Sequence, residues 1–198
     1  MLGLPKSTEV ERQLPKKLIC EKFNMNTAAR ERFDACVSRI FITNEISPAT
    51  VSIAAGDTVK MIFVLNVQLK AKAFDEKQIL LLSKLIDQNL IFVLSFGGEI
   101  MPAVVCGKLF CAPWCPAEEF AVTLTGLDLD AAWENLILQI TGVQLQGNNT
   151  LDEQIAENER REKLKKEIDR LEKLARKEQQ PRKKYELVEK IKEMKKQL

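Results

Sequence analysis

The chain has 198 residues, which is enough for one well-buried domain and an appendage. Hydrophobic residues make up 45% of it and the formal net charge is +2, so its composition does not indicate a dedicated nucleic-acid binder. No apolar run reaches the ~18–20 residues of a membrane span, and the N-terminus lacks the order of a signal peptide. The five cysteines are irregularly spaced, which favours reduced thiols and a cytoplasmic protein without membrane contact.

Short helices are expected at the N-terminal end. Ser7 or Thr8 is placed to cap a helix that ends before Pro15, and Thr8 lies three residues before a glutamate, the spacing of a capping box. Pro15 is suited to the start of a second helix, and Asn26 or Thr27 opens a third. The alternation of apolar and polar residues over 39–46 then predicts a strand with one open face.

The central part of the chain reads as strand, helix, strand. Residues 61–69 form an apolar run rich in β-branched and aromatic side chains, which is typical of a buried strand. Asp75 is placed to cap a helix, which we expect to end at Asn89, and residues 90–94 form a second buried strand. This order predicts a right-handed crossover between two parallel strands.

A hairpin and further strands are expected after the crossover. Glycines in residues 95–99 predict a tight turn, and residues 100–106 form the return strand. Pro102 in that strand favours an edge position or a bulge. Residues 108–111 extend the meander, a brief strand is expected at 51–54, and the alternation over 120–125 predicts the last strand.

A helix closes the globular part. Asp128 is placed to cap it, and Gly142 lies where a helix end often needs a left-handed residue. The sequence therefore predicts an α+β domain over residues 1–145, with a mixed sheet of about five or six strands, a central βαβ crossover and flanking helices.

A polar hinge at residues 146–150 precedes a charged tail over 151–198. The tail holds 16 Lys/Arg and 12 Asp/Glu, and Pro181 separates two helical segments. Apolar residues recur at spacings of four and three, which predicts an antiparallel helical hairpin of the coiled-coil type. We expect a protein partner, or a second copy, to bind the following residues of this seam: Leu164, Ile168, Leu171, Leu187, Ile191 and Met194. The alternative is that the tail packs on its own body.

The sequence has few residues or motifs that could support catalysis or bind a cofactor. The chain has no histidine, which removes the common nucleophile pairs and the commonest general base. It also lacks glycine-rich phosphate loops, so we expect no cofactor. Cys106, Cys111 and Cys115 lack a fourth ligand at zinc-site spacing, so we interpret them as small apolar residues and expect no metal.

One pattern is reminiscent of a nuclease. Restriction-endonuclease-like enzymes hold Mg²⁺ with carboxylates near a Glu/Gln-x-Lys strand end, and Gln68 and Lys70 have that spacing. Asp57 is too far along the same strand to share an ion with Gln68, so Glu45 is the better second ligand. Because Gln-x-Lys is a common tripeptide, outward-facing polar residues on a strand end are the simpler interpretation.

Nearly the whole chain resembles a bacterial family of domains of unknown function. The matching segments are LGLPKSTEV, NEISPATVSIAAGDTV, FDEKQILLLSKLIDQNLIFVL, TGLDLDAAWENLILQI and the tail QIAENERREKLKKEIDRLEK with QPRKKYELV. The resemblance implies genes that lie near helicase and DNA-methyltransferase genes in restriction-like or phage-defence clusters. It implies no catalytic residues.

These observations favour a non-enzymatic accessory or adaptor protein that acts through protein–protein contacts of its tail. Two other functions are left open by the sequence. One is a Mg²⁺-dependent nuclease that uses Glu45, Gln68 and Lys70. The other is an adaptor that binds nucleic acid through the basic tail, although that tail interleaves both charge signs.

Overall fold

The computed structural model describes residues 2–142, 151–178 and 180–195. The chain divides into two compact units, Met1–Gly142 and Val143–Leu198. The first unit holds a β-sheet with helices, and the second holds two long helices. The expected hinge at residues 146–150 lies outside the described residues.

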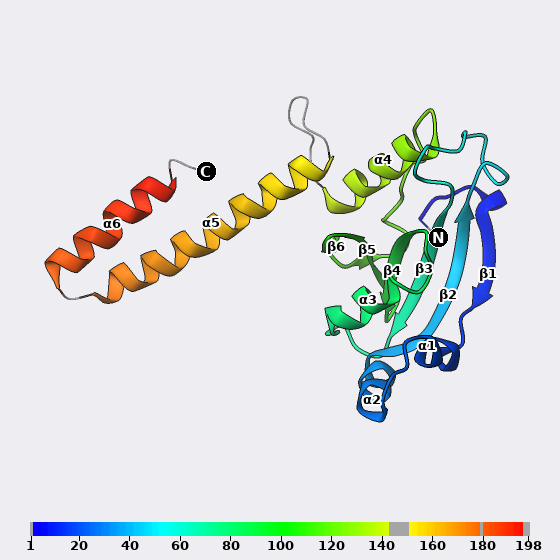
Figure 1. Ribbon diagram of the computed structural model, residues 1–198, viewed down its shortest axis with the longest axis horizontal. Helices are drawn as coiled ribbons and strands as arrows, with labels where there is room; N and C mark the ends of the chain where they lie inside the picture. Colours follow the sequence, from blue (N-terminus) through cyan, green and yellow to red (C-terminus); the bar gives the residue numbers. More distant parts are fainter. Residues whose placement is uncertain (1, 143–150, 179, 196–198) are drawn as a thin grey trace. The chain divides into compact units, whose positions relative to one another are not determined.

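A mixed sheet organises the first unit, which confirms the expected α+β class (Figure 1). Its order is β1-β2-β3-β4-β5-β6, and β7 pairs with β5 beside β6. The neighbours β3 and β4 are parallel, whereas the other pairs are antiparallel. The strands of the described residues are β1 (Glu9–Gln13), β2 (Val37–Ile46), β3 (Ile62–Leu69), β4 (Asn89–Phe96), β5 (Glu99–Cys106), β6 (Lys108–Cys111) and β7 (Cys115–Pro116).

The crossover predicted at the centre of the chain is present. Helix α3 (Glu76–Leu82) connects β3 to β4, and the Asp75 carboxylate caps it by accepting a 3.0 Å hydrogen bond from Lys77 N. The helix ends at Leu82, earlier than expected from the apolar residues that continue to position 86. Those later residues still pack on the core, so their apolar character does not require helical structure.

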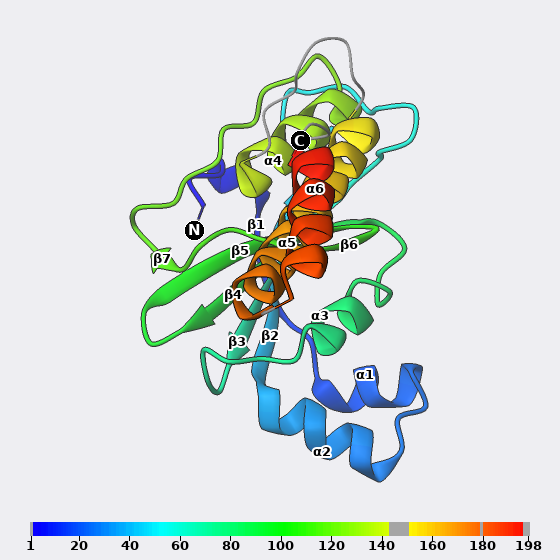
Figure 2. The same ribbon diagram turned by 90° about the vertical axis from the view of Figure 1, so that its left-hand side faces the viewer.

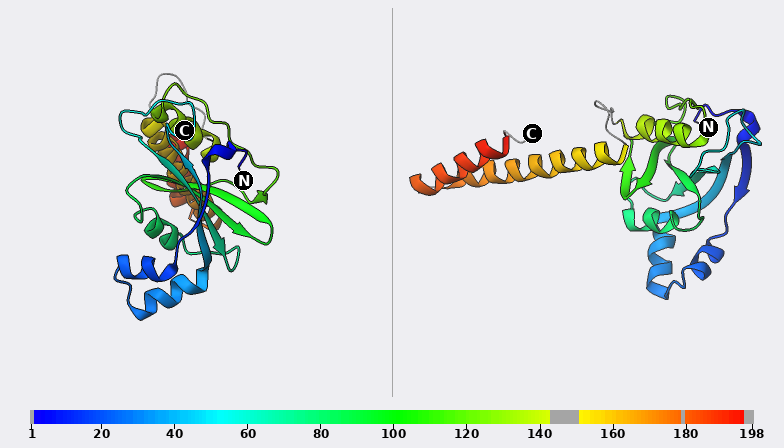
Figure 3. Two further views of the ribbon diagram at one scale, coloured as in Figure 1. Left: turned by 90° about the vertical axis from the view of Figure 1, so that its right-hand side faces the viewer. Right: turned by 45° about the horizontal axis from the view of Figure 1, so that its top comes forward.

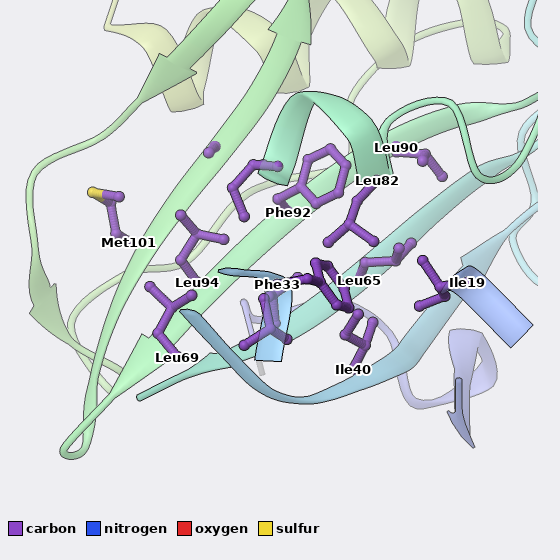
Figure 4. Packing of buried hydrophobic residues seen from close by; sticks show 14 of the residues in the cluster. Ile19, Phe33, Ile40, Leu65, Leu69, Leu82, Leu90, Phe92, Leu94 and Met101 are labelled. Atoms are coloured by element: carbon purple, nitrogen blue, oxygen red, sulfur yellow. The ribbon is translucent and has the colours of Figure 1, made fainter. Parts of the chain in front are cut away.

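Three helices pack against one face of the sheet: α1 (Lys16–Lys22), α2 (Thr27–Cys36) and α3. Figure 4 shows the core on this side, where Phe33 of α2 lies among side chains of β2, β3 and β4 such as Ile40, Leu65 and Phe92. Each of these four residues is fully buried. Burial of apolar side chains at such positions contributes roughly 1.5–3 kcal/mol each to folding.

Helix α4 (Leu129–Thr141) packs against β5 and β6 (Figure 2). The Asp128 carboxylate caps the helix by accepting a 2.9 Å hydrogen bond from Ala131 N, as predicted. Gly142 ends it with a φ of 67°, a left-handed conformation that glycine adopts without the Cβ penalty. The apolar side of α4, which includes Leu136 and Ile140, is buried.

The N-terminal prediction was wrong in one element. A short 3-10 helix, η1 (Lys6–Thr8), is followed by strand β1 and not by an α-helix. The β1 backbone pairs with β2, and Asn44 Nδ2 of β2 donates a 2.9 Å hydrogen bond to Thr8 Oγ1. The Thr8 side chain therefore bonds a strand residue and does not cap a helix. Pairing of β1 with the distant strand β2 outweighs the local sequence pattern that favours a helix start. Figure 3 shows β1 beside β2.

Two other strand predictions were wrong. Residues 120–125 form no strand, because their backbone groups find other partners: Val122 N donates to Leu2 O, and the Gln139 amide of α4 bonds both N and O of Thr123. The segment 51–54 contributes only an isolated bridge between Ala54 and Asp128. In both segments, side-chain amides and isolated backbone hydrogen bonds pair with the N–H and C=O groups that a neighbouring strand would otherwise pair with.

Pro102 lies in the interior of the sheet, not at its edge, because β5 has β4 on one side and β6 and β7 on the other. Its carbonyl accepts a 2.8 Å hydrogen bond from Ala112 N, between the ladders of β6 and β7. The N and C=O of one strand residue point to the same side, so the missing N–H faces this junction. The interrupted ladder accommodates the proline.

The second unit consists of α5 (Leu151–Lys177) and α6 (Pro181–Lys195). They pack on each other through buried Ile168, Leu171 and Ala175 of α5 and Ile191 of α6. Near the end of α6, Lys195 Nζ lies 2.8 Å from Glu172 Oε1, so the early turns of α5 extend beyond α6 (Figure 1).

Candidate functional site

The residues expected for a nuclease site lie apart in the sheet. Glu45 is paired with Phe63, whereas Gln68 is paired with Arg39, six positions away along β2 or about 20 Å. Side chains alternate between the two faces of a strand, and Phe63 and Gln68 are five positions apart on β3, so Glu45 and Gln68 project from opposite faces. Lys70 is exposed and follows the end of β3. The structure therefore does not bring Glu45 and Gln68 together.

An open depression with a volume of about 360 Å³, called here the strand-end cavity, lies on the sheet where the parallel strands β3 and β4 end. Carboxyl ends of parallel strands are frequent ligand sites in sheets with crossover connections. The residues that line the cavity are Ser38, Asn66, Gln68, Leu69, Ser95, Phe96, Gly97, Gly98, Glu99, Ile100 and Ala117. Its size is within the range of small-molecule sites.

The floor of the strand-end cavity holds a buried polar pair. Asn66 is only 6% exposed in a mostly apolar strand, and Ser95 Oγ of β4 donates a 2.8 Å hydrogen bond to Asn66 Oδ1. Gln68 lies beside Ser95 in the parallel register. A buried amide oxygen without a hydrogen-bond donor would cost about 1–3 kcal/mol of folding free energy. The hydrogen bond from Ser95 avoids this cost and fixes the position of the Asn66 side chain.

Ser38 reaches this floor through a β-bulge. The pairing of β2 with β3 shifts between Val37 and Arg39, which leaves Ser38 as the extra residue. Bulges re-aim side chains and are common next to functional sites. Within the described part of the chain, the side chains of Ser38 and Gln68 make no hydrogen bond to protein groups, so both are open to a ligand.

The cavity lining is close to neutral. Among its lining residues, all of them described, Glu99 is the one ionisable group, and its carboxylate forms an ion pair with Lys72. Lys72 Nζ also lies 5.7 Å from the centroid of the Trp114 ring. Amide and hydroxyl groups therefore dominate the chemistry that this site offers.

The predicted partner-binding residues meet between the two helices of the second unit. Ile168, Leu171 and Ile191 are buried there, and Leu187 and Met194 pack against them. Leu164 is half-buried and lies outside this cluster. Most of the predicted seam is thus occupied by contacts between α5 and α6, and a partner would have to bind beside it.

A groove lies beside the seam, with a volume of about 430 Å³. Ala175, Val188 and Ile191 provide its apolar surface, and its charged residues are Glu172, Arg176, Lys192 and Lys195. We call this the tail groove. The hydrogen bond from Lys195 holds the pKa of Glu172 below its usual value, and the hydrogen bond to Glu189 raises the pKa of Lys192. Both shifts favour the charged forms of Glu172 and Lys192.

A family described as a domain of unknown function, DUF4391, matches residues 2–198. The chain belongs to the DUF4391 family. No curated protein and no solved structure matches the sequence, so the family is the extent of what similarity shows. Among the described residues of this DUF4391 chain, no helix is both long and apolar enough to cross a lipid bilayer.

The described residues of the DUF4391 protein offer no cluster of three or more His, Cys, Asp or Glu side chains that could hold a metal ion. Among the described residues, Cys106, Cys111 and Cys115 form no disulfide bond. Burial, and secondarily the Glu76 carboxylate, raises the pKa of the Cys111 thiol to about 11. That thiol stays protonated at neutral pH, which makes it a poor nucleophile.

Asp130 forms the most heavily bonded carboxylate in the described part of the DUF4391 fold. It accepts hydrogen bonds of 2.6 Å from Asp57 N, 2.7 Å from Thr58 Oγ1 and 2.7 Å from Val59 N. These bonds, led by the Thr58 hydroxyl, lower the pKa of Asp130 to about 2. Because every partner belongs to the loop before β3, Asp130 anchors this loop to α4 and does not form an open site.

Sequence reasoning missed the strand-end cavity in this DUF4391 chain. The signal available was the alternation of Asn66 and Gln68 within an apolar strand. It could not show that Ser95 lies beside them, or that a bulge brings Ser38 there, because both depend on the pairing of distant strands.

Proposed function

We propose that this DUF4391 protein is a non-enzymatic accessory subunit that acts through protein–protein contacts of α5 and α6, arranged as an antiparallel coiled-coil hairpin. The observation that supports the proposal is the tail groove, where an apolar strip lies between charged residues: Val188 is exposed, and Ala175 and Ile191 beneath it are buried between α5 and α6. Val188 is 36% exposed, which leaves part of this strip in contact with water.

The small core between the two helices also supports a further partner. Among the described residues, four apolar side chains are buried between α5 and α6. A helix pair with so little buried surface is marginal by itself, since helical stability comes mainly from tertiary packing. Each additional Å² of apolar surface covered by a partner helix contributes about 25 cal/mol, so covering the tail groove stabilises the unit.

We infer that the occupant of the tail groove is a second copy of this chain. Residues 151–159 carry four acidic and no basic side chains, whereas residues 181–198 carry seven basic and three acidic ones. The early turns of α5 extend beyond α6, so they have the length to lie along the α6 of another copy. Opposite charge favours that placement, and two-fold symmetry repeats it on the second groove.

The oligomeric state tests this proposal. Size-exclusion chromatography with light scattering should give twice the 22.5 kDa mass of one chain. Val188→Glu places a charge in the apolar strip and should return the mass to that of a monomer. The matched control is Leu18→Glu, which changes a 59% exposed leucine of α1 and should leave the dimer intact. A monomer at every concentration of the natural chain would overturn the proposal.

Charge reversal tests the inferred occupant. Lys192→Glu in the tail groove and Glu157→Lys in the acidic segment should each weaken the dimer, whereas the double variant should restore it. Recovery in such a cycle reports direct coupling of the two positions. The dimer should also weaken as salt increases, because exposed charges are screened. Independent, additive effects of the two substitutions would rule out the acidic segment as the occupant.

We further propose that the subunit serves a bacterial multi-protein system of the restriction-like or phage-defence kind. The support for this proposal is the family resemblance alone. Where a helicase and a methyltransferase are encoded beside it, their co-expression with this chain should yield a complex that co-elutes with it. Val188→Glu should weaken that complex if it forms on the dimer. Separate elution of all three proteins would count against this placement.

A further inference from the structure

We propose that the strand-end cavity binds an uncharged planar heterocycle of the nucleobase class. The site belongs to the first unit and includes no residue of the tail. Three features support it: the hydrogen-bonding groups of the cavity floor, the apolar surface beside them and the nearly neutral lining.

The floor offers hydrogen-bond donors and acceptors on one face of the sheet. Gln68 of β3 provides a side-chain amide, Ser95 lies beside it on β4 with its hydroxyl donating to Asn66, and the bulge at Ser38 adds a second hydroxyl. A primary amide presents two donors and an acceptor in one plane, which matches the edge of a base. Asn and Gln recognise adenine in this manner through two parallel hydrogen bonds.

The remaining surface of the cavity is apolar or lacks side chains. Ile100 is paired with Ser95 and so lies on the same face of the sheet, and Ala117 belongs to the segment after β7. Gly97 and Gly98 form the adjoining turn with φ of 59° and 88°, and a Cβ at either would meet no atom within 4 Å. A flat ring has apolar faces and a polar edge, which fits this division of the lining.

The same division disfavours other ligand classes. A sugar ring carries a hydroxyl group on almost every carbon around its edge, so more hydroxyl groups would be left without hydrogen-bond partners beside Ile100 and Ala117 than for a base. A phosphate group would need cations or a helix N-terminus, and the cavity lining has neither. Glu99 is already neutralised by Lys72, so a cationic ligand gains little there.

Titration of the full chain with adenosine, guanosine, cytidine and uridine tests the proposal, with glucose as the sugar arm. Amide resonances of Gly97 and Gly98 should shift with at least one nucleoside, and calorimetry should give one site per chain. Gln68→Met keeps the size of the side chain and removes its hydrogen bonds, so it should weaken binding at least tenfold. Ser95→Ala should do the same.

Gln78→Met is the matched control, since Gln78 is a half-buried glutamine on α3, across the sheet from the cavity. It should bind as the natural chain does, and circular dichroism should show that all three variants are folded. No binding of any nucleoside, binding of glucose alone, or affinity unchanged in Gln68→Met would each overturn the proposal.

A second arm distinguishes a free nucleoside from a base within a strand. A short single-stranded oligonucleotide of the preferred base should compete for the same Gly97 and Gly98 resonances if the site accepts bases in a strand. Binding through the base edge should change little with salt, whereas contacts to a phosphate backbone weaken steeply. Either result keeps the nucleobase site and identifies its source, provided that Gln68→Met abolishes the shifts.

Discussion

At the scale of single residues, Asp130 makes the clearest prediction. Its pKa in the folded protein, about 2, is below the ordinary value of 3.8. The ionised carboxylate therefore stabilises the fold at any pH above its unfolded pKa, and this contribution is lost as the pH falls from about 4 through about 2. Asp130→Asn should lower the melting temperature at pH 7 by a few degrees, and the difference from the natural chain should vanish near pH 2.

Thermal melts followed by circular dichroism between pH 7 and pH 2 measure this effect. Asp87→Asn is the control, because Asp87 is exposed and should give the same melting curve as the natural chain. Gly56→Ala should reproduce the Asp130 effect, since a Cβ on Gly56 would lie 2.4 Å from the Asp130 carboxyl carbon. A constant difference across the whole pH range would show that the ionised carboxylate is not responsible.

At the scale of elements, the sequence was most informative where the signal is local. Asp75 and Asp128 each cap the helix that was expected to follow them, and Gly142 ends α4 in a left-handed conformation. The same reasoning failed at Thr8, where a capping pattern was outweighed by pairing of β1 with β2. The strand-end cavity depends on register and on a bulge at Ser38, which no local pattern encodes.

In residues 120–125, the side chain of Gln139 takes the place of a neighbouring strand as hydrogen-bond partner of the backbone, and this can be tested. Gln139 Oε1 accepts a 2.8 Å hydrogen bond from Thr123 N, and Gln139 Nε2 donates a 2.9 Å hydrogen bond to Thr123 O. Gln139→Met should remove both bonds and lower the free energy of unfolding by about 1 kcal/mol, a small loss because both bonds are exposed to solvent. The Thr123 amide should exchange with solvent faster. Gln88→Met, in an exposed bend, serves as the control, and unchanged exchange at Thr123 would contradict the assignment.

At the scale of the whole molecule, the two units provide separate probes. Trp114 and Trp133 both belong to the first unit, whereas α5 and α6 contribute much of the helical signal. If the tail dimerises as proposed, its melting temperature depends on protein concentration by mass action, whereas an independent first unit does not follow it. Circular dichroism at the helical band should therefore show a transition that rises with concentration, while tryptophan fluorescence should not.

The variant Val188→Glu connects this expectation to the tail groove. In a monomer, α5 and α6 retain only the packing around Ile168, Leu171, Ala175 and Ile191, so their transition should move to lower temperature and lose its dependence on concentration. The fluorescence transition should stay where it is in the natural chain, because no residue of the first unit is changed. Coincident transitions by both probes at every concentration would mean that the two units unfold together, and the tail would then be held by its own body and not by a second copy.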